Sequence, residues 1–168
     1  MAQLRPSDAT DLDFLKDMLF EALFWDPEAK RPAFGSFCGD PEFTKLLAGW
    51  GRTGDRAVIA EEDGVRRGGA WFRLWTAESH SYGFVDARTP EIAIAVRPDY
   101  RSRGLGRELL RALVQQARAD GYQSLSLSVS PKNSALRLYE STGFCKVGES
   151  GTSWTLMLSL DQQQVKST

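Results

Sequence analysis

A short apolar strand, a basic turn and an amphipathic helix follow one another near the middle of the chain, and this succession constrains the fold more than any other feature. Residues 91–96 read EIAIAV, and Pro98 ends the strand. The turn carries Gly104 and Gly106, and leucines then recur at helical spacing until Gly121, which suits a helix C-cap. A strand that enters a helix through a glycine turn is typical of folds that mix helices with a sheet.

The remainder of the chain alternates helix and strand signals. We expect strands at residues 57–61, 69–75, 123–129, 144–147 and 153–160, and helices after a Ser7 cap, at residues 43–48 and at residues 133–142. Asp63 and Gly64 are typical of a hairpin turn. Residues 123–129 alternate serine with aliphatic side chains and predict a half-buried strand. This order predicts an α+β fold, or α/β with a mixed sheet.

Length and composition favour one globular domain. With 168 residues, we expect a single domain over residues 1–160 and a flexible polar tail over residues 161–168. A formal net charge of −1 argues against nucleic acid or membrane partners. No apolar run approaches the ~18 residues of a membrane span, and we see no signal peptide. Two cysteines and one histidine give no disulfide framework and no metal site, so we expect a cytoplasmic protein.

The basic turn at residues 101–107 has the chemistry of an anion site. Glycines let the backbone approach a ligand closely, and the first N–H groups of a helix lack internal partners at its positive end. Arginines 101, 103 and 107 add positive charge. Together these features predict a cradle for a pyrophosphate. The alternative is that the glycines only shape a helix start and the arginines are solvated.

Two familiar phosphate motifs do not fit this turn. The chain lacks the Gly-x-x-x-x-Gly-Lys-Ser/Thr pattern of nucleotide triphosphatases. Leu109 stands where a dinucleotide fingerprint needs its third glycine, and no acid closes the strand at residues 123–129. A nucleotide-binding enzyme is therefore disfavoured.

Two signatures resemble the GNAT superfamily of acyl-CoA-dependent N-acyltransferases. Arg101-x-x-Gly104-x-Gly106 after a short strand resembles its coenzyme A pyrophosphate loop, and residues 133–144 (NSALRLYESTGF) resemble its second signature. The resemblance implies a central, mostly antiparallel sheet flanked by helices and splayed at the acyl-CoA site, with acetyl-CoA as co-substrate and no metal. It implies coenzyme contacts from Ile94, Ala95, Val96, Arg101, Ser102, Arg103, Gly104, Leu105, Gly106, Arg107 and Asn133. Asn133 is also expected to cap the helix that follows it.

The resemblance also supplies catalytic candidates. It places Tyr139 beside the coenzyme sulfur, where a phenol can protonate the leaving thiolate. Glu91 resembles the base that takes a proton from the amine, directly or through water. A buried core tyrosine and a solvated strand-end acid are the alternatives. His80 has a suitable pKa for a base but lies in an unassigned loop.

The acceptor is the least constrained part of the prediction. Aromatic residues gather in the N-terminal half, and Trp71, Arg73 and Trp75 would share one strand face that could line a cleft. Asp26 and Asp40 could attract an ammonium group. These aromatics could equally form core or homodimer contacts. The sequence thus predicts an N-acetyltransferase of small-molecule or peptide amines; the alternative is a non-catalytic acyl-CoA binding or sensing module.

Overall fold

A computed structural model of the chain describes residues 1–161, and they divide into two compact units. The first unit contains Met1–Arg73 and Ile92–Leu113. The second contains Leu74–Glu91 and resumes at Val114. Each unit combines antiparallel strands with helices, which confirms the predicted α+β class.

The single domain over residues 1–160 remains a proposal. The flexible tail over residues 161–168 lies, apart from Asp161, outside the described residues. Within the part of the chain that the structure describes, none of the helices has the length and apolar character needed to cross a membrane.

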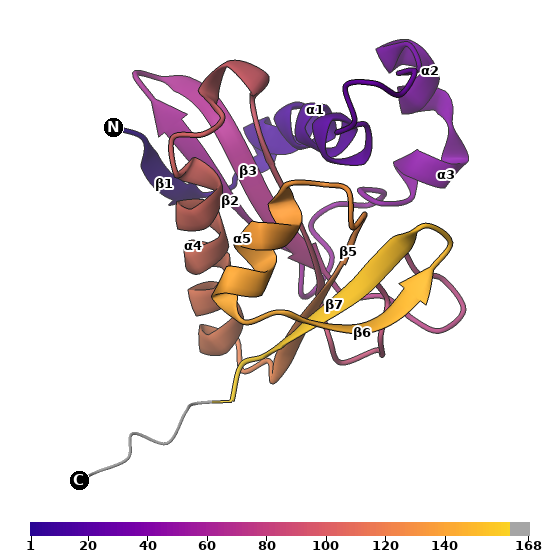
Figure 1. Ribbon diagram of the computed structural model, residues 1–168. Helices are drawn as coiled ribbons and strands as arrows, with labels where there is room; N and C mark the ends of the chain where they lie inside the picture. Colours follow the sequence, from indigo (N-terminus) through magenta and orange to yellow (C-terminus); the bar gives the residue numbers. More distant parts are fainter. Residues whose placement is uncertain (162–168) are drawn as a thin grey trace, which may run out of the picture. The chain divides into compact units, whose positions relative to one another are not determined.

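The strands of the first unit run in the order β1-β2-β3-β4, and Figure 1 shows the first three side by side. Their bounds are β1 (Gln3–Pro6), β2 (Arg56–Glu62), β3 (Val65–Arg73) and β4 (Glu91–Val96), of which Glu91 itself belongs to the second unit. Asp63 and Gly64 both have positive φ, 52° and 74°, as the predicted hairpin turn requires. β3 begins four residues before the predicted strand, because Arg66, Arg67 and Gly68 interrupt the apolar pattern after Val65.

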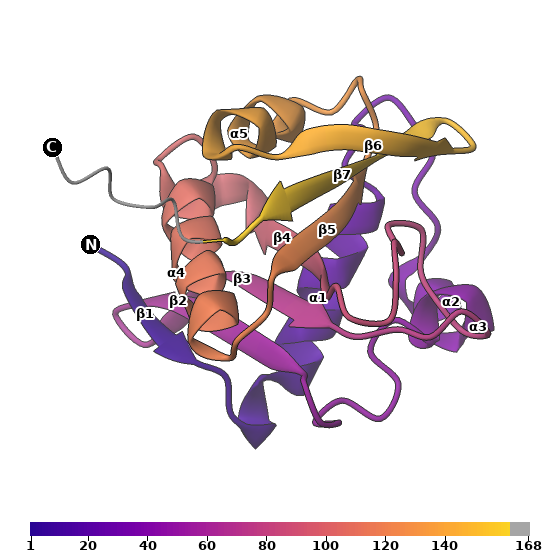
Figure 2. The same cartoon turned by 90° about the horizontal axis from the view of Figure 1, so that it is seen from below.

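The helices of the first unit flank β3 on both faces. Their bounds are η1 (Ala9–Asp11), α1 (Leu12–Leu23), α2 (Phe34–Gly39), α3 (Pro41–Thr44), η2 (Pro98–Tyr100) and α4 (Leu105–Ala119, which enters the second unit at Val114). A side chain at Gly68 would meet Leu109 of α4, and one at Gly69 would meet Leu15 of α1. Consecutive strand residues point to opposite faces, so one helix packs on each face of β3 (Figure 2). The approach of α4 at Gly68 is the closer one, because a side-chain carbon there would lie 3.1 Å from Leu109, against 3.6 Å from Leu15 at Gly69.

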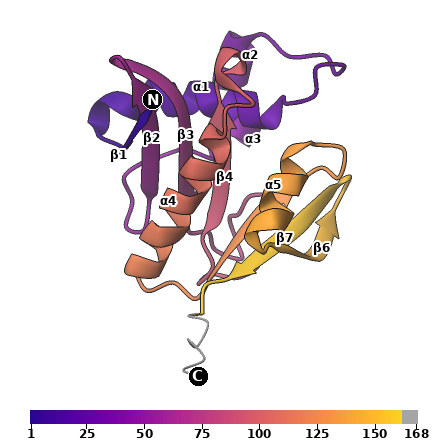
Figure 3. The same cartoon turned by 60° about the vertical axis from the view of Figure 1, so that its left-hand side comes forward.

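The second unit is a small antiparallel sheet with one helix beside it (Figure 3). The strands β5 (Ser124–Val129), β7 (Ser153–Ser159) and β6 (Cys145–Ser150) lie in that order, and α5 spans Ala135–Thr142. Gly143 ends α5 with a φ of 110°, and the ring of Phe144 contacts Tyr139 at 5.9 Å between centroids. The predicted glycine cap with an apolar clasp is therefore confirmed.

The residues that could line a cleft or form core contacts are buried, which agrees with the second alternative. Trp71, Arg73 and Trp75 are 3%, 2% and 7% exposed. Arg73 donates from Nε and Nη2 to the two carboxylate oxygens of Asp55, at 3.0 and 2.8 Å. Its Nη1 also donates to the carbonyl of Ala48 at 2.8 Å. Arg73 is thus a core residue and not a cleft residue. Its charge is neutralised by a buried ion pair with Asp55, in which two parallel hydrogen bonds join the guanidinium and the carboxylate.

Replacing Asp55 with asparagine should destabilise the protein by about 3–5 kcal/mol, because the buried Arg73 guanidinium loses its counter-charge. Urea unfolding measures this loss. Asp63→Asn is the matched control: it removes a carboxylate from an exposed turn whose positive φ asparagine tolerates. Equal midpoints for the two variants would contradict a buried, charge-paired Arg73.

Candidate active site

Glu91 is a partly buried carboxyl at the first position of β4. It pairs with Ser126 in the parallel register of β4 and β5. The Gly83 N–H donates to Glu91 Oε2 at 3.2 Å, and the Ser81 hydroxyl also bonds the carboxyl. Loss of solvation raises the pKa of Glu91 to about 7, although both hydrogen bonds favour the ionised form. A carboxyl of this kind changes its protonation at neutral pH, as a general base requires.

The backbone at Gly83 lies directly on β5 and covers Glu91. A side-chain carbon at Gly83 would sit 2.6 Å from the carbonyl carbon of Leu127 and 3.0 Å from the Glu91 carboxyl carbon. Ser126 Oγ donates to the Gly83 carbonyl at 2.7 Å, so both backbone groups of Gly83 are engaged. Only a residue without a side chain fits this position.

The serines of β5 explain how the covering segment is held. Ser124 and Ser126 are 9% and 0% exposed, and the Ser124 hydroxyl bonds that of Thr89 at 2.9 Å. The Ser126 N–H donates to the carbonyl of Pro90 at 3.0 Å. The prediction of a half-buried strand was therefore wrong for this face. A useful signal was available, because a solvated face would carry charged side chains rather than short hydroxyls.

His80 belongs to the same segment as Gly83, but it is not a buried residue. Its side chain is exposed, its ring stacks on Phe84 at 4.5 Å, and Nδ1 lies 2.8 Å from the Ser81 carbonyl oxygen. These contacts attach it to its own loop. His80 remains the second candidate for the base.

Tyr139 lies on α5 with 8% of its surface exposed. Its apolar surroundings raise the pKa of the phenol to about 12. The hydroxyl therefore stays protonated throughout the physiological range and can act only as a donor of a proton or a hydrogen bond.

Asn133 lies just before the same helix. Its Oδ1 accepts a hydrogen bond from the Ala135 N–H at 3.0 Å, while Ser134 occupies the cap position without a side-chain bond. The expected capping bond is present, one residue further out than a standard cap.

The phosphate turn, residues 101–106, has the backbone of an anion cradle. Ser102 and Gly104 have positive φ, 62° and 81°, and space is open around Gly104 where a side chain would project. α4 begins at Leu105, so the last two residues of this segment, Leu105 and Gly106, already belong to the first turn of the helix. The first N–H groups of α4 lack partners within the helix, and its positive end faces this turn. The turn therefore fits a diphosphate.

The arginines of this turn have protein partners. Arg101 donates from Nη2 to Glu21 Oε2 at 3.0 Å and from Nε to the Val96 carbonyl at 3.1 Å. The Arg103 guanidinium lies 4.4 Å from the ring centroid of Tyr100. Arg101 is thus turned toward α1, an arrangement that the motif did not predict.

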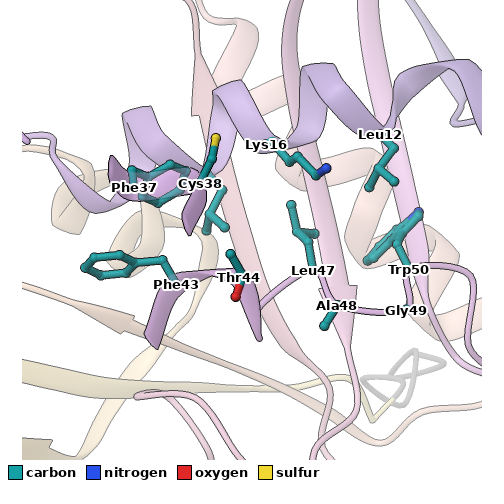
Figure 4. Close-up of a pocket in the computed structure, with 11 residues that line it drawn as sticks. Leu12, Lys16, Phe37, Cys38, Phe43, Thr44, Leu47, Ala48, Gly49 and Trp50 are labelled. Atoms are coloured by element: carbon teal, nitrogen blue, oxygen red, sulfur yellow. The ribbon is translucent and has the colours of Figure 1, made fainter. Parts of the chain in front are cut away.

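A cavity of about 380 Å³ lies in the first unit between α1 and the segment from α2 to Trp50 (Figure 4). Buried Leu19, Phe37 and Leu47 give it apolar walls, and exposed Lys16 and Cys38 also line it. Its lining therefore combines apolar side chains with polar groups such as the Lys16 ammonium and the Thr44 hydroxyl.

The acidic residues expected near an ammonium group serve local turns instead. Asp40 accepts a hydrogen bond from the Glu42 N–H and caps α3, and Asp26 accepts one from the Glu28 N–H. Neither lines the cavity. In residues 1–161, no group of three His, Cys, Asp or Glu side chains is placed to hold a metal ion.

Known proteins resemble this chain in both sequence and fold. The Acetyltransferase (GNAT) family matches residues 18–144, a range that includes Glu91, the phosphate turn and Tyr139. The structure of yncA from Salmonella typhimurium with its cofactor acetyl-CoA matches with a TM-score of 0.66 and 25% identity, covering 97% of this chain and 96% of that one.

Curated relatives match over shorter ranges. The L-amino acid N-acyltransferase MnaT of Escherichia coli is 33% identical over 113 residues, which are 65% of this chain and 63% of that protein. A ribosomal protein bS18-alanine N-acetyltransferase of Escherichia coli is 48% identical over 52 residues, 30% of this chain and 35% of that enzyme. The chain thus spans less than two thirds of the length of these relatives.

Replacing Gly83 with alanine should lower stability by about 1–3 kcal/mol, because the added carbon meets the β5 backbone. The segment must lift, water then reaches Glu91, and the pKa of Glu91 should fall from about 7 toward its ordinary 4.5. Thermal unfolding and a carbon-13 NMR titration of the carboxyl measure the two effects. Gly148→Ala, where space is open, is the control and should change neither. An unchanged Glu91 titration in the Gly83 variant would show that the segment does not set its pKa.

Proposed function

The chain belongs to the Acetyltransferase (GNAT) family, and on that premise we propose that it moves an acetyl group from acetyl-CoA to a primary amine of a small molecule or peptide. Glu91 is the general base and Tyr139 the general acid of this proposal. The observation that carries it is the covered Glu91 carboxyl, whose pKa of about 7 suits removal of a proton at neutral pH.

The coenzyme would be held by the phosphate turn and by backbone groups. Open space at Gly104 and the positive end of α4 support a pyrophosphate at residues 101–106. By family resemblance, the backbone of Ile94, Ala95 and Val96 holds the pantetheine amides, and Asn133 contacts the coenzyme. The thioester of bound acetyl-CoA supplies the activated acetyl group.

The two candidate residues have complementary protonation states. An alkylamine is mostly protonated at neutral pH and must lose a proton before it attacks a carbonyl, so it needs a base such as ionised Glu91. The leaving thiolate gains from a donor, and Tyr139 with a pKa of about 12 stays protonated.

The relatives support an amine acceptor. Their names give an L-amino acid and the alanine of a ribosomal protein as acceptors. A cytoplasmic location belongs to the same proposal and is supported by the exposed free thiols of Cys38 and Cys145, which a reducing compartment preserves.

An acetylation screen tests this function. The purified protein is incubated with acetyl-CoA and a panel of amino acids, polyamines and peptides, and release of free coenzyme A thiol is measured. Amine-dependent release supports the enzyme. Tight acetyl-CoA binding without release for any amine would favour the non-catalytic acyl-CoA binding module.

Replacing Glu91 with glutamine should lower kcat/KM by about 10²–10⁴-fold. In the wild type, kcat/KM should rise with pH through about 7, because the carboxyl is a base only when ionised and its pKa is raised to that value. The variant should lose this rise. If the variant keeps the wild-type pH–rate profile, His80 or a water chain is the base.

Replacing Tyr139 with phenylalanine should reduce turnover at least about tenfold while acetyl-CoA affinity stays near normal. The loss should shrink with an acyl donor whose leaving thiol is more acidic, since that thiolate needs less protonation. A merely structural tyrosine would instead cost about 1 kcal/mol of stability and leave turnover unchanged. Melting temperature, affinity and turnover on one preparation distinguish the two roles.

A further inference from the structure

Glu21 connects two parts of the first unit that are distant in sequence. It lies on the last turn of α1, and its side chain is 15% exposed. It receives hydrogen bonds from Arg31, at 3.2 Å to Oε1 and 2.9 Å to Oε2. Arg101 of the phosphate turn bonds the same Oε2 at 3.0 Å. One carboxylate is therefore shared by two guanidinium groups from different segments.

Each guanidinium is also fixed by its own surroundings. Arg31 donates to the carbonyl of Phe24 at 2.8 Å and lies over the ring of Phe20 at 5.1 Å. Arg101 donates to the Val96 carbonyl, at the end of β4. The chain of contacts thus runs from the segment after α1, through Glu21, to the strand end and the phosphate turn.

The side chain of Arg101 fixes one end of the phosphate turn. Its Nε and Nη2 are both engaged by protein acceptors, so the guanidinium ties the first residue of the turn to β4 and α1. The backbone after it then adopts positive φ at Ser102 and Gly104. A turn with such a conformation loses less freedom on binding a ligand when one end is already fixed.

We propose that Glu21 is a positioning residue for the phosphate turn, holding Arg101 in place and coupling coenzyme affinity to Arg31 and the segment that carries it. This inference rests on the proposed function, because it assumes that the turn binds the coenzyme pyrophosphate. Glu21 touches no reacting group, and its effect passes through Arg101.

Glu21→Gln keeps the shape of the side chain and removes its charge. We expect the Kd and KM for acetyl-CoA to rise about tenfold, because both charge-assisted hydrogen bonds weaken and the turn is no longer fixed. The kcat at saturating acetyl-CoA should stay unchanged. S-acetylpantetheine, which has no pyrophosphate, should bind the variant and the wild type equally. A general loss of structure would weaken both ligands.

Arg31→Gln is the second and more demanding variant, because Arg31 lies outside the turn. It should raise the Kd for acetyl-CoA about threefold, since an exposed ion pair contributes modestly. The double variant Arg31→Gln with Glu21→Gln should bind no more weakly than Glu21→Gln alone, because Arg31 acts through Glu21. Glu28→Gln, an exposed glutamate in the segment between α1 and α2, is the control and should change nothing.

Calorimetric titration of folded variants, checked by melting temperature, decides between the outcomes. Failure of the wild type to bind acetyl-CoA would overturn the proposed function itself. If the wild type binds, an unchanged or lower Kd in Glu21→Gln overturns the positioning role. Additive effects in the double variant overturn the coupling through Glu21.

Discussion

The contact between Gly83 and β5 is the interaction on which the candidate active site depends. Without it, Glu91 would be an ordinary acid at the start of a strand, solvated and ionised at neutral pH. The missing side chain lets the backbone lie against Leu127, and the Ser126 hydroxyl and the Glu91 carboxyl then bind the two polar groups of Gly83. Because the segment excludes water but supplies only weakly compensating hydrogen bonds, the pKa of Glu91 rises to about 7.

The same loss of solvation acts on Tyr139 with a different chemical consequence. It makes Glu91 a stronger base near neutral pH, and it makes Tyr139 a weaker acid, with a pKa of about 12. A free thiol has a pKa near ~8.5, so a full proton transfer from this phenol to a solvated thiolate would be uphill. In the proposed reaction, Tyr139 therefore first stabilises the developing thiolate by a charge-assisted hydrogen bond. Complete protonation follows only as the thiolate itself is desolvated and its pKa rises.

Features encoded by a few adjacent residues could be predicted from the sequence. The Asp63-Gly64 turn and the Gly121 and Gly143 caps have the positive φ that their residue types favour. The covering of Glu91 could not be predicted, because the bond from Ser126 to Gly83 spans 43 residues and the segment at residues 78–90 has no periodicity. The choice between cleft and core for Arg73 stayed open in the sequence for a related reason: Asp55, the partner that lets Arg73 be buried, lies outside the strand pattern.

Arg101 shows why a basic motif does not by itself identify phosphate ligands. Its predicted contact with the coenzyme stays a prediction, and in the structure the guanidinium is directed at Glu21 and the Val96 carbonyl. The electrostatic contribution is nevertheless retained. Arg31 and Arg101 share one carboxylate, which leaves a net positive charge on this group, and Arg103 adds another beside Tyr100. In the proposed site, the field of the fixed arginines attracts the pyrophosphate and the backbone N–H groups of the turn contact it directly. Because the arginine side chains are already held by protein partners, they are ordered before binding, and the ligand does not have to immobilise them.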